Sequence, residues 1–122
     1  MAGILLFLFL TPHLPHDATI HGESWHIIGV DHLSKDYDGW TECAINTMLV
    51  DTSESLSEQA ETLTHEILHA LTCEDGELNN DFWNNEDDDH DGIYWAAPEL
   101  AQFIKDNPQV ISFIQQAYGT HP

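Results

Sequence analysis

Hydrophobic and polar residues alternate with two different periods along this chain. Between residues 17 and 51 the apolar positions recur at every second residue or form short runs rich in β-branched side chains, which is typical of β-strands. Gly22-Glu23 and Asp38-Gly39 are expected to be turns. The pattern predicts three strands, over residues 18–21, 24–30 and 40–51. A small antiparallel sheet is the expected result.

The segment that follows has the period of an α-helix. Ser55, with Glu58 three residues later, is typical of a capping box at a helix start. We expect the helix to end near Cys73, with Gly76 as its terminator. Its apolar stripe is made of Leu56, Ala60, Leu63, Ile67, Ala70 and Leu71. The stripe is expected to face the core and to leave the opposite face to a polar cleft.

The last part of the chain is predicted to form an acidic loop and two helices. Residues 74–92 are dominated by Asn and Asp and are expected to be a loop. A helix is expected over residues 93–105, with Pro98 either in its first turn or at a kink. Asn107-Pro108 predicts the cap of a final helix, which runs to Gly119. The expected fold class is therefore α+β.

The central helix contains the motif H-E-x-x-H, from His65 to His69. Two histidines four residues apart lie one above the other on a helix, so both can bind one metal ion. Glu66 lies about 100° further round the helix, where its carboxylate can accept a proton from a water at that metal. The motif lies mid-helix and away from the apolar stripe, which favours a zinc site over a pair of solvated histidines.

A catalytic zinc ion takes three protein ligands and leaves its fourth position open. The order of the elements places the third ligand just before the helix expected at residue 93. His90 is favoured, because it lies three residues before Ile93 and therefore on the same helix face. Asp91 is the alternative, and Glu86 and Asp87 follow. The other acidic residues of this loop are expected to be solvated.

The same loop also fits the first half of an EF-hand calcium site. Asp87, Asp89, Asp91 and Gly92 match the pattern D-x-D-x-D-G. The second half does not fit, because Pro98 occupies the position of the bidentate glutamate. Calcium is accordingly the second cofactor that the sequence suggests, and it could order the loop beside a zinc site.

The charge balance is strongly acidic. The 122 residues include 22 Asp and Glu but only 2 Lys and Arg, which gives a formal net charge of −20. Binding to nucleic acid or to an anionic membrane is excluded as a function class, because both require Lys or Arg. The charge fits a protein of a salty environment, attraction of cations, or mimicry of DNA. The length predicts a single domain, and we expect a monomer.

The N-terminus and the cysteines are less informative. Residues 1–16 are expected to be an apolar extension or strand ahead of one domain over residues 17–122. The apolar run is too short to span a bilayer and lacks the basic start and cleavage site of a signal peptide. Cys43 and Cys73 are interpreted as small buried hydrophobes, with a single disulfide or a metal ligand at Cys73 as alternatives. A cytoplasmic location is expected, with secretion as the open alternative.

Residues 61–70, followed by the segment 96–108, resemble small H-E-x-x-H metallopeptidase-like proteins of phages and bacteria. These proteins belong to the zincins, near the minimal gluzincins, and the resemblance covers roughly residues 39–114. It implies a zincin-like fold, in which the helix that carries the motif is the active-site helix.

The resemblance also implies roles for individual residues. His65 and His69 would be zinc ligands and Glu66 the general base. Proteins of this kind usually carry a glutamate as the third ligand just before the second helix. This chain has His90 and Asp91 at the matching positions.

The function expected from the sequence is zinc-dependent hydrolysis of a peptide or protein substrate, with Glu66 as general base. The strand from Cys43 to Val50 is expected to offer an edge to which an extended peptide can add. Two other classes stay open. One is a catalytically inert module that binds zinc or calcium, and the other is an acidic interaction protein that mimics DNA.

Overall fold

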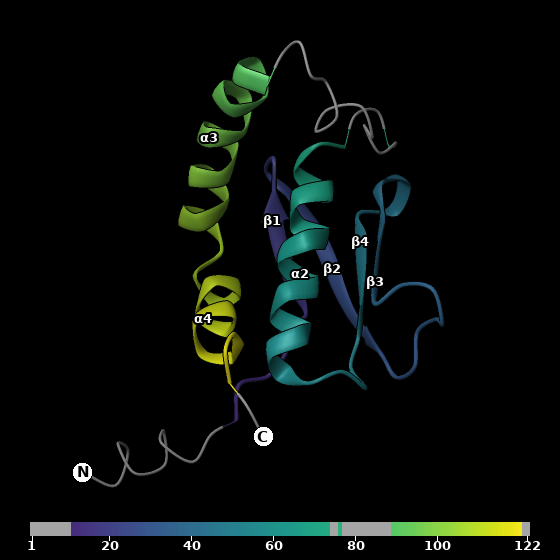
Figure 1. Ribbon diagram of the computed structural model, residues 1–122. Helices are drawn as coiled ribbons and strands as arrows, with labels where there is room; N and C mark the ends of the chain where they lie inside the picture. Colours follow the sequence, from purple (N-terminus) through teal and green to yellow (C-terminus); the bar gives the residue numbers. More distant parts are fainter. Residues whose placement is uncertain (1–10, 74–75, 77–88, 121–122) are drawn as a thin grey trace, which may run out of the picture.

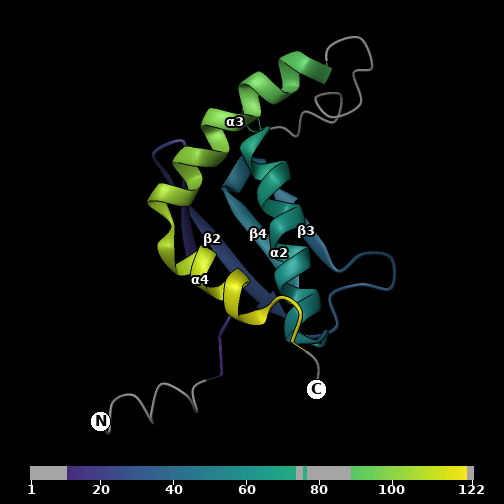
Figure 2. The same cartoon turned by 60° about the vertical axis from the view of Figure 1, so that its left-hand side comes forward.

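The computed structural model describes residues 11–73, residue 76 and residues 89–120. Their strands are β1 (Asp17–Ile20), β2 (Glu23–Val30), β3 (Gly39–Glu42) and β4 (Thr47–Asp51), and their helices are α2 (Leu56–Leu71), α3 (Asp89–Asp106) and α4 (Pro108–Ala117). The four strands form one sheet, and the helices lie on one side of it (Figures 1 and 2). The fold class is therefore α+β, as predicted.

The sheet is mixed and not purely antiparallel, which corrects the expectation from the sequence. Its strand order is β1-β2-β4-β3. β1 pairs antiparallel with β2, and β3 pairs antiparallel with β4, but β2 and β4 run parallel. After β2 the chain first forms β3 at the edge of the sheet. It then returns as β4, which fills the place between β2 and β3 and runs parallel to β2.

The third strand that was expected over residues 40–51 is in fact two strands. A short 3₁₀ helix, η1 (Cys43–Ile45), separates β3 from β4. Asn46 then adopts a left-handed conformation with φ of 47°, which reverses the chain. Asparagine tolerates this region better than most residues, because its short polar side chain forms local hydrogen bonds. The first hairpin was predicted correctly, but its two-residue turn is His21-Gly22, one residue earlier than expected.

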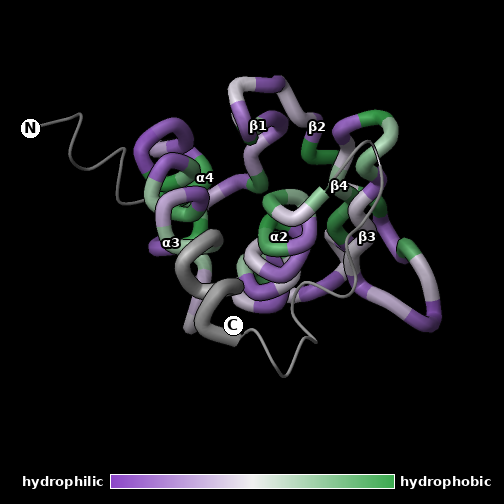
Figure 3. Tube along the Cα trace, turned by 90° about the horizontal axis from the view of Figure 1, so that it is seen from above, coloured by the Kyte–Doolittle hydropathy of each residue, from purple (hydrophilic) through white to green (hydrophobic). Residues whose placement is uncertain are grey.

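Helix α2 matches its prediction closely. The Ser55 hydroxyl accepts a hydrogen bond from the backbone N–H of Glu58 at 3.2 Å, as a capping residue should. Five of the six residues of the apolar stripe are buried, and Leu56 is partly buried against the same core. Figure 3 shows α2 lying beside the sheet, viewed from above. The buried hydrophobic residues around it are Ala18, Ile20, Trp25, Ile27, Met48, Val50, Phe103, Val110, Phe113 and Ala117.

The C-terminal helices differ from their predictions in two details. α3 begins at Asp89, so the last four residues of the expected loop are helical, and the helix runs through Pro98. Asn107 precedes α4, but its side chain forms no cap. Instead its amide pairs with both backbone groups of Thr19 in β1, at 2.6 and 2.7 Å. The buried Asn107 thereby fixes the corner between α3 and α4 against the first edge of the sheet.

Cys43 and Cys73 form a disulfide, which corrects their interpretation as free hydrophobes. Their Cα atoms are 5.9 Å apart, and the bond joins the end of β3 to the end of α2. None of the described helices is long and apolar enough to cross a membrane.

Reduction of this disulfide should destabilise the domain. The bond links residues 30 positions apart and so restricts the unfolded chain. Reduction returns that conformational entropy to the unfolded chain, which should lower the free energy of unfolding by about 3–4 kcal/mol. Urea denaturation with and without a reducing agent measures it. The double variant Cys43→Ser/Cys73→Ser is the control and should not respond to the reductant. Equal stabilities of the oxidised and reduced parent protein would contradict the prediction.

Candidate active site

The two histidines of the motif lie side by side on the outer part of α2. The Nε2 atoms of His65 and His69 are 3.1 Å apart, and the ring centroids are 4.8 Å apart. Zinc binds histidine nitrogen at about 2.0–2.1 Å, and tetrahedral geometry then separates two such nitrogens by roughly 3.3 Å. The rings therefore fit a shared zinc ion with little movement, and His65 is exposed to solvent.

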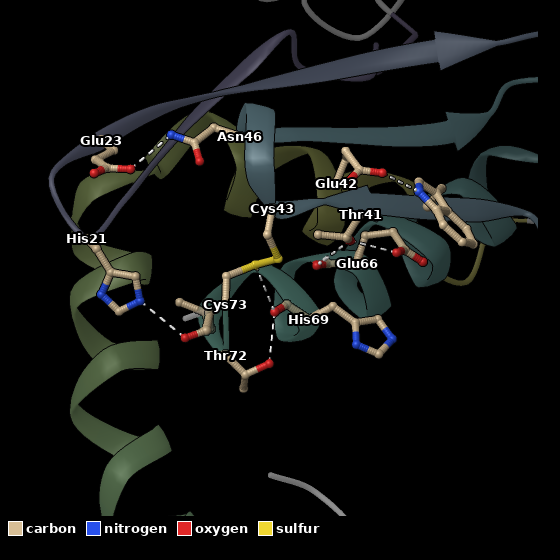
Figure 4. Close-up of a disulfide and its surroundings, with 12 residues drawn as sticks. His21, Glu23, Thr41, Glu42, Cys43, Asn46, Glu66, His69, Thr72 and Cys73 are labelled. Atoms are coloured by element: carbon tan, nitrogen blue, oxygen red, sulfur yellow. Dashed lines mark hydrogen bonds between the residues drawn. A yellow bond between two sulfur atoms is a disulfide. The ribbon is translucent and has the colours of Figure 1, made fainter. Parts of the chain in front are cut away.

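Glu66 points in another direction, towards β3. Only 5% of its surface is exposed, and its Oε1 accepts a hydrogen bond from the Thr41 hydroxyl at 2.7 Å. Figure 4 shows Thr41 and Glu66 facing one another between the strand and the helix. Among the described residues, Oε2 has no hydrogen-bond partner. One carboxylate oxygen is thus held in place while the other is free to accept a proton.

Gly39 makes room for this carboxylate. A Cβ atom at this position would lie 2.6 Å from Cγ2 of Thr62 and 2.8 Å from Oε2 of Glu66. Contacts shorter than 3 Å force neighbouring atoms to shift. The absence of a side chain at the start of β3 therefore allows the carboxylate to lie directly beside the strand.

A cavity of about 390 Å³ opens next to Glu66. Residues 37–39 form one wall. The other wall consists of five residues of α2, namely Glu58, Glu61, Thr62, His65 and Glu66. The volume lies in the range of about 300–1,000 Å³ that is typical of ligand sites. The cavity brings one of the two histidines of the motif, His65, and the predicted base onto a common surface, whereas His69 is not part of its lining.

The predicted candidates for the third metal ligand lie at or beyond the edge of the described part of the chain. The backbones of His90 and Asp91 belong to the first turn of α3, but their side chains lie outside the described part of the chain, as do Glu86 and Asp87. Within the described residues, no third His, Cys, Asp or Glu side chain joins the pair on α2 in a metal-sized group. A ligand from the start of α3 therefore stays a prediction.

The calcium prediction fits this part of the chain poorly. Asp87 lies outside the described residues, but Asp89 and Asp91 are in the first turn of α3. An EF-hand presents these positions from an open loop that bends sharply at the following glycine. The helical start at Asp89 does not have this form.

Cys73 cannot serve as a metal ligand while it is bonded to Cys43, so the disulfide excludes that alternative for the oxidised protein. Its Sγ instead lies 3.7 Å from the backbone carbonyl oxygen of His69, one turn earlier in α2. The bond therefore fixes the last turn of the helix that carries the motif (Figure 4).

An acidic triad lies at the other end of β4. Carboxylate oxygens of Asp38, Asp51 and Glu54 come within 4.8 Å of one another, a grouping that could hold a cation. Both carboxylate oxygens of the buried Asp51 already accept hydrogen bonds from the protein, however. Oδ1 accepts bonds from the Ser53 hydroxyl, the Ser53 N–H and the His32 N–H, and Oδ2 accepts one from the Leu33 N–H. We assign Asp51 a structural role, in which it organises the chain between β2 and β3.

The sequence alone did not indicate several residues of the site. Thr41 and Gly39 contact Glu66 only because β3 packs on α2, which is a long-range arrangement. The sequence could have indicated only that Gly39 and Thr41 share one face of the strand, because residues two apart in a strand point to the same side. Tyr37, which forms a cavity wall, precedes the strand and gave no signal.

Comparison with protein-family models, with curated proteins and with solved structures finds no match to this chain. The site is therefore interpreted from its own geometry.

Replacing either histidine of the pair should weaken zinc binding. His65→Ala and His69→Ala are each expected to lower the affinity on the order of 100-fold or more, because even the loss of a residue behind a zinc ligand costs 10–100-fold. Competition with a chromogenic chelator measures the affinity. The chain has nine histidines, so the exposed His26 provides the matched control. Equal affinities of His26→Ala and His65→Ala would contradict the assignment.

Asp51 should contribute to stability in a pH-dependent way. Hydrogen bonds from the Ser53 side chain and backbone, followed by those from Leu33 and His32, hold its pKa below the ordinary value of 3.8. A lowered pKa means that the stabilisation is complete above pH 3.8 and is lost as the pH falls through the pKa of the folded state. Asp51→Asn should therefore be less stable than the parent at neutral pH, and the difference should shrink in acid. Urea denaturation across pH measures this difference, and a constant difference would contradict the prediction.

Proposed function

We propose that the protein is a zinc-dependent metallopeptidase. The observation that supports this best is the pair of imidazole nitrogens 3.1 Å apart, on the same helix turn as a buried glutamate whose Oε2 has no partner among the described residues. A helix that presents H-E-x-x-H in this way provides two metal ligands and a general base within one turn. His90 is the third ligand that we propose, with Asp91 as the alternative, because both lie at the start of α3.

The chemistry divides between the metal and Glu66. A zinc ion held by His65, His69 and the third ligand would supply Lewis-acid activation of water and of the substrate carbonyl. Glu66 Oε2 accepts the proton of the attacking water and afterwards donates it to the leaving amine nitrogen. Thr41 keeps the carboxylate in one orientation by its bond to Oε1, and Glu66 is part of the cavity lining.

The substrate edge belongs to β3 and not to the segment from Cys43 to Val50. β4 lies inside the sheet, between β2 and β3, and cannot take another strand. β3 is an edge strand with no further partner in the described sheet, and it packs on α2 beside Glu66. An extended peptide that adds to β3 would place its backbone next to the cavity.

We further propose that the protein functions in an oxidising compartment, in place of the cytoplasm expected from the sequence. Disulfides persist outside the reducing cytosol, and the bond between Cys43 and Cys73 fixes both sides of the proposed site.

Replacement of the proposed base should separate catalysis from metal binding. Glu66→Gln is expected to retain zinc but to lower kcat/KM by about 100-fold to 10,000-fold, because the amide cannot accept a proton. Cleavage of a quenched fluorescent peptide library with elemental analysis measures both properties. Glu23→Gln, an exposed change on β2, is the control. A Glu66→Gln variant as fast as the parent would contradict the role of the base, whereas a zinc-loaded parent without any cleavage would indicate an inert metal-binding module.

A further inference from the structure

The lining of the cavity beside Glu66 is strongly acidic, and a zinc ion held by His65 would offset only two of its four carboxylate charges. Half of its lining residues bear carboxylates, namely Asp38, Glu58, Glu61 and Glu66. The chain has only two lysine or arginine residues, Lys35 and Lys105, and neither lines the cavity, whereas His65 does. A concave surface of one sign concentrates the electrostatic potential and attracts groups of the opposite charge. The ligand of this cavity is therefore expected to carry positive charge.

The arrangement of the carboxylates argues against a second metal ion as this ligand. Among the described residues, the only three carboxylates within 4.8 Å of one another are Asp38, Asp51 and Glu54, of which two do not line the cavity. Glu58 and Glu61 are instead spread along the exposed face of α2, one turn apart. A divalent cation needs oxygens that converge on one point. A longer cationic group can contact them in succession.

The opposite wall supplies an apolar surface. Tyr37 lines the cavity, and its ring lies 5.1 Å from that of Trp40 in β3, at an interplanar angle of 40°. Both residues are exposed, at 43% and 45% of their surfaces, but only Tyr37 lines the cavity. Aromatic faces attract ammonium and guanidinium groups, and the aliphatic part of a lysine or arginine side chain packs against such rings. An aromatic ring at Tyr37, opposite the carboxylates of α2, suits a basic side chain better than a small inorganic cation.

The buried carboxylate of Glu66 in the cavity lining is a second observation that indicates a ligand site. Glu66 is 95% buried, lines the cavity and has an Oε2 atom without a partner among the described residues. The cavity also lies next to β3, the edge to which an extended peptide can add. Alternate side chains of a bound strand point to the same face, so one of them can enter the cavity while the backbone stays on β3.

We propose that this cavity binds a lysine or arginine side chain of the peptide substrate and so makes the protein selective for basic sequences. The proposal rests on the proposed peptidase function, whose substrate class it specifies. Glu58, Glu61 and Asp38 attract the charged end of the side chain, Tyr37 packs against its aliphatic part, and Glu66 remains available for proton transfer.

Binding of matched peptide pairs tests this selectivity. In short alanine-based peptides, one position at a time carries either lysine or the uncharged Nε-acetyl-lysine. Fluorescence anisotropy gives the Kd of each peptide for zinc-loaded Glu66→Gln, in which cleavage is expected to be at least about 100-fold slower than in the parent. The parent protein, stripped of metal by chelation, is measured in parallel in case the variant fails to fold. We expect one position at which lysine binds about tenfold more tightly, as two or three exposed ion pairs and a cation–π contact predict.

Further substitutions, added to the protein used for binding, test which residues cause the preference for lysine. Glu61→Gln and Glu58→Gln should each lower the lysine preference about threefold at that position, since each removes one exposed ion pair. The control is Asp106→Asn, which removes the same charge on α3, beside the opposite edge of the sheet from β3 (Figure 1). It should leave the ratio unchanged. Raising the salt concentration from about 50 mM to about 500 mM should also reduce the preference.

The outcomes separate this proposal from the proposed function. An equal preference for lysine at every position, or an equal loss in Asp106→Asn, would assign the effect to the net charge of −20 and overturn the cavity as the recognition site. Equally fast cleavage by the parent of both peptides of every pair would overturn the selectivity alone. A position-specific preference that Glu61→Gln reduces, in a protein that cleaves no peptide, would support the cavity and reject only the hydrolysis.

Discussion

The contact between β3 and α2 is the constraint on which the candidate site depends. Alternate residues of the chain from Gly39 onwards face the helix, and each makes a different contact with it. Gly39 leaves space for the Glu66 carboxylate, Thr41 donates a hydrogen bond to it, and Cys43 is bonded to Cys73 at the end of the helix. Because a strand repeats every two residues, one register fixes all three contacts. A shift by a single residue would place Trp40 and Glu42 against the helix and remove the site.

This packing also separates the roles of neighbouring residues in the motif. His65 and His69 stay on the outer side of α2, where a metal can reach them, while Glu66 is turned into the interface with β3. Burial of a carboxylate is costly unless it is hydrogen-bonded, and here the bond comes from the edge strand itself. The orientation of the proposed base is therefore set by the same strand that would bind the substrate.

Local patterns in the sequence predicted the parts of the fold that local interactions determine. The start of α2 at Leu56 and its buried stripe follow from a capping serine and a 3.6-residue period, and His65, Glu66 and His69 lie on it as expected. The division of residues 40–51 by Asn46 was missed, because a left-handed residue inside an apolar run leaves the hydrophobic pattern almost unchanged. The parallel pairing of β2 with β4, the disulfide and the Thr41 contact depend on residues distant in the chain, which periodicity does not record.

The central claim is that one zinc ion binds between the two histidines of α2 and a ligand from the first turn of α3. An anomalous difference map, collected at the zinc absorption edge from crystals of the zinc-loaded protein, tests it most directly. The account predicts a single strong peak in contact with Nε2 of His65 and of His69, joined by His90 or Asp91. A map without a peak at this pair, or with zinc only at Asp38, Asp51 and Glu54, would contradict it.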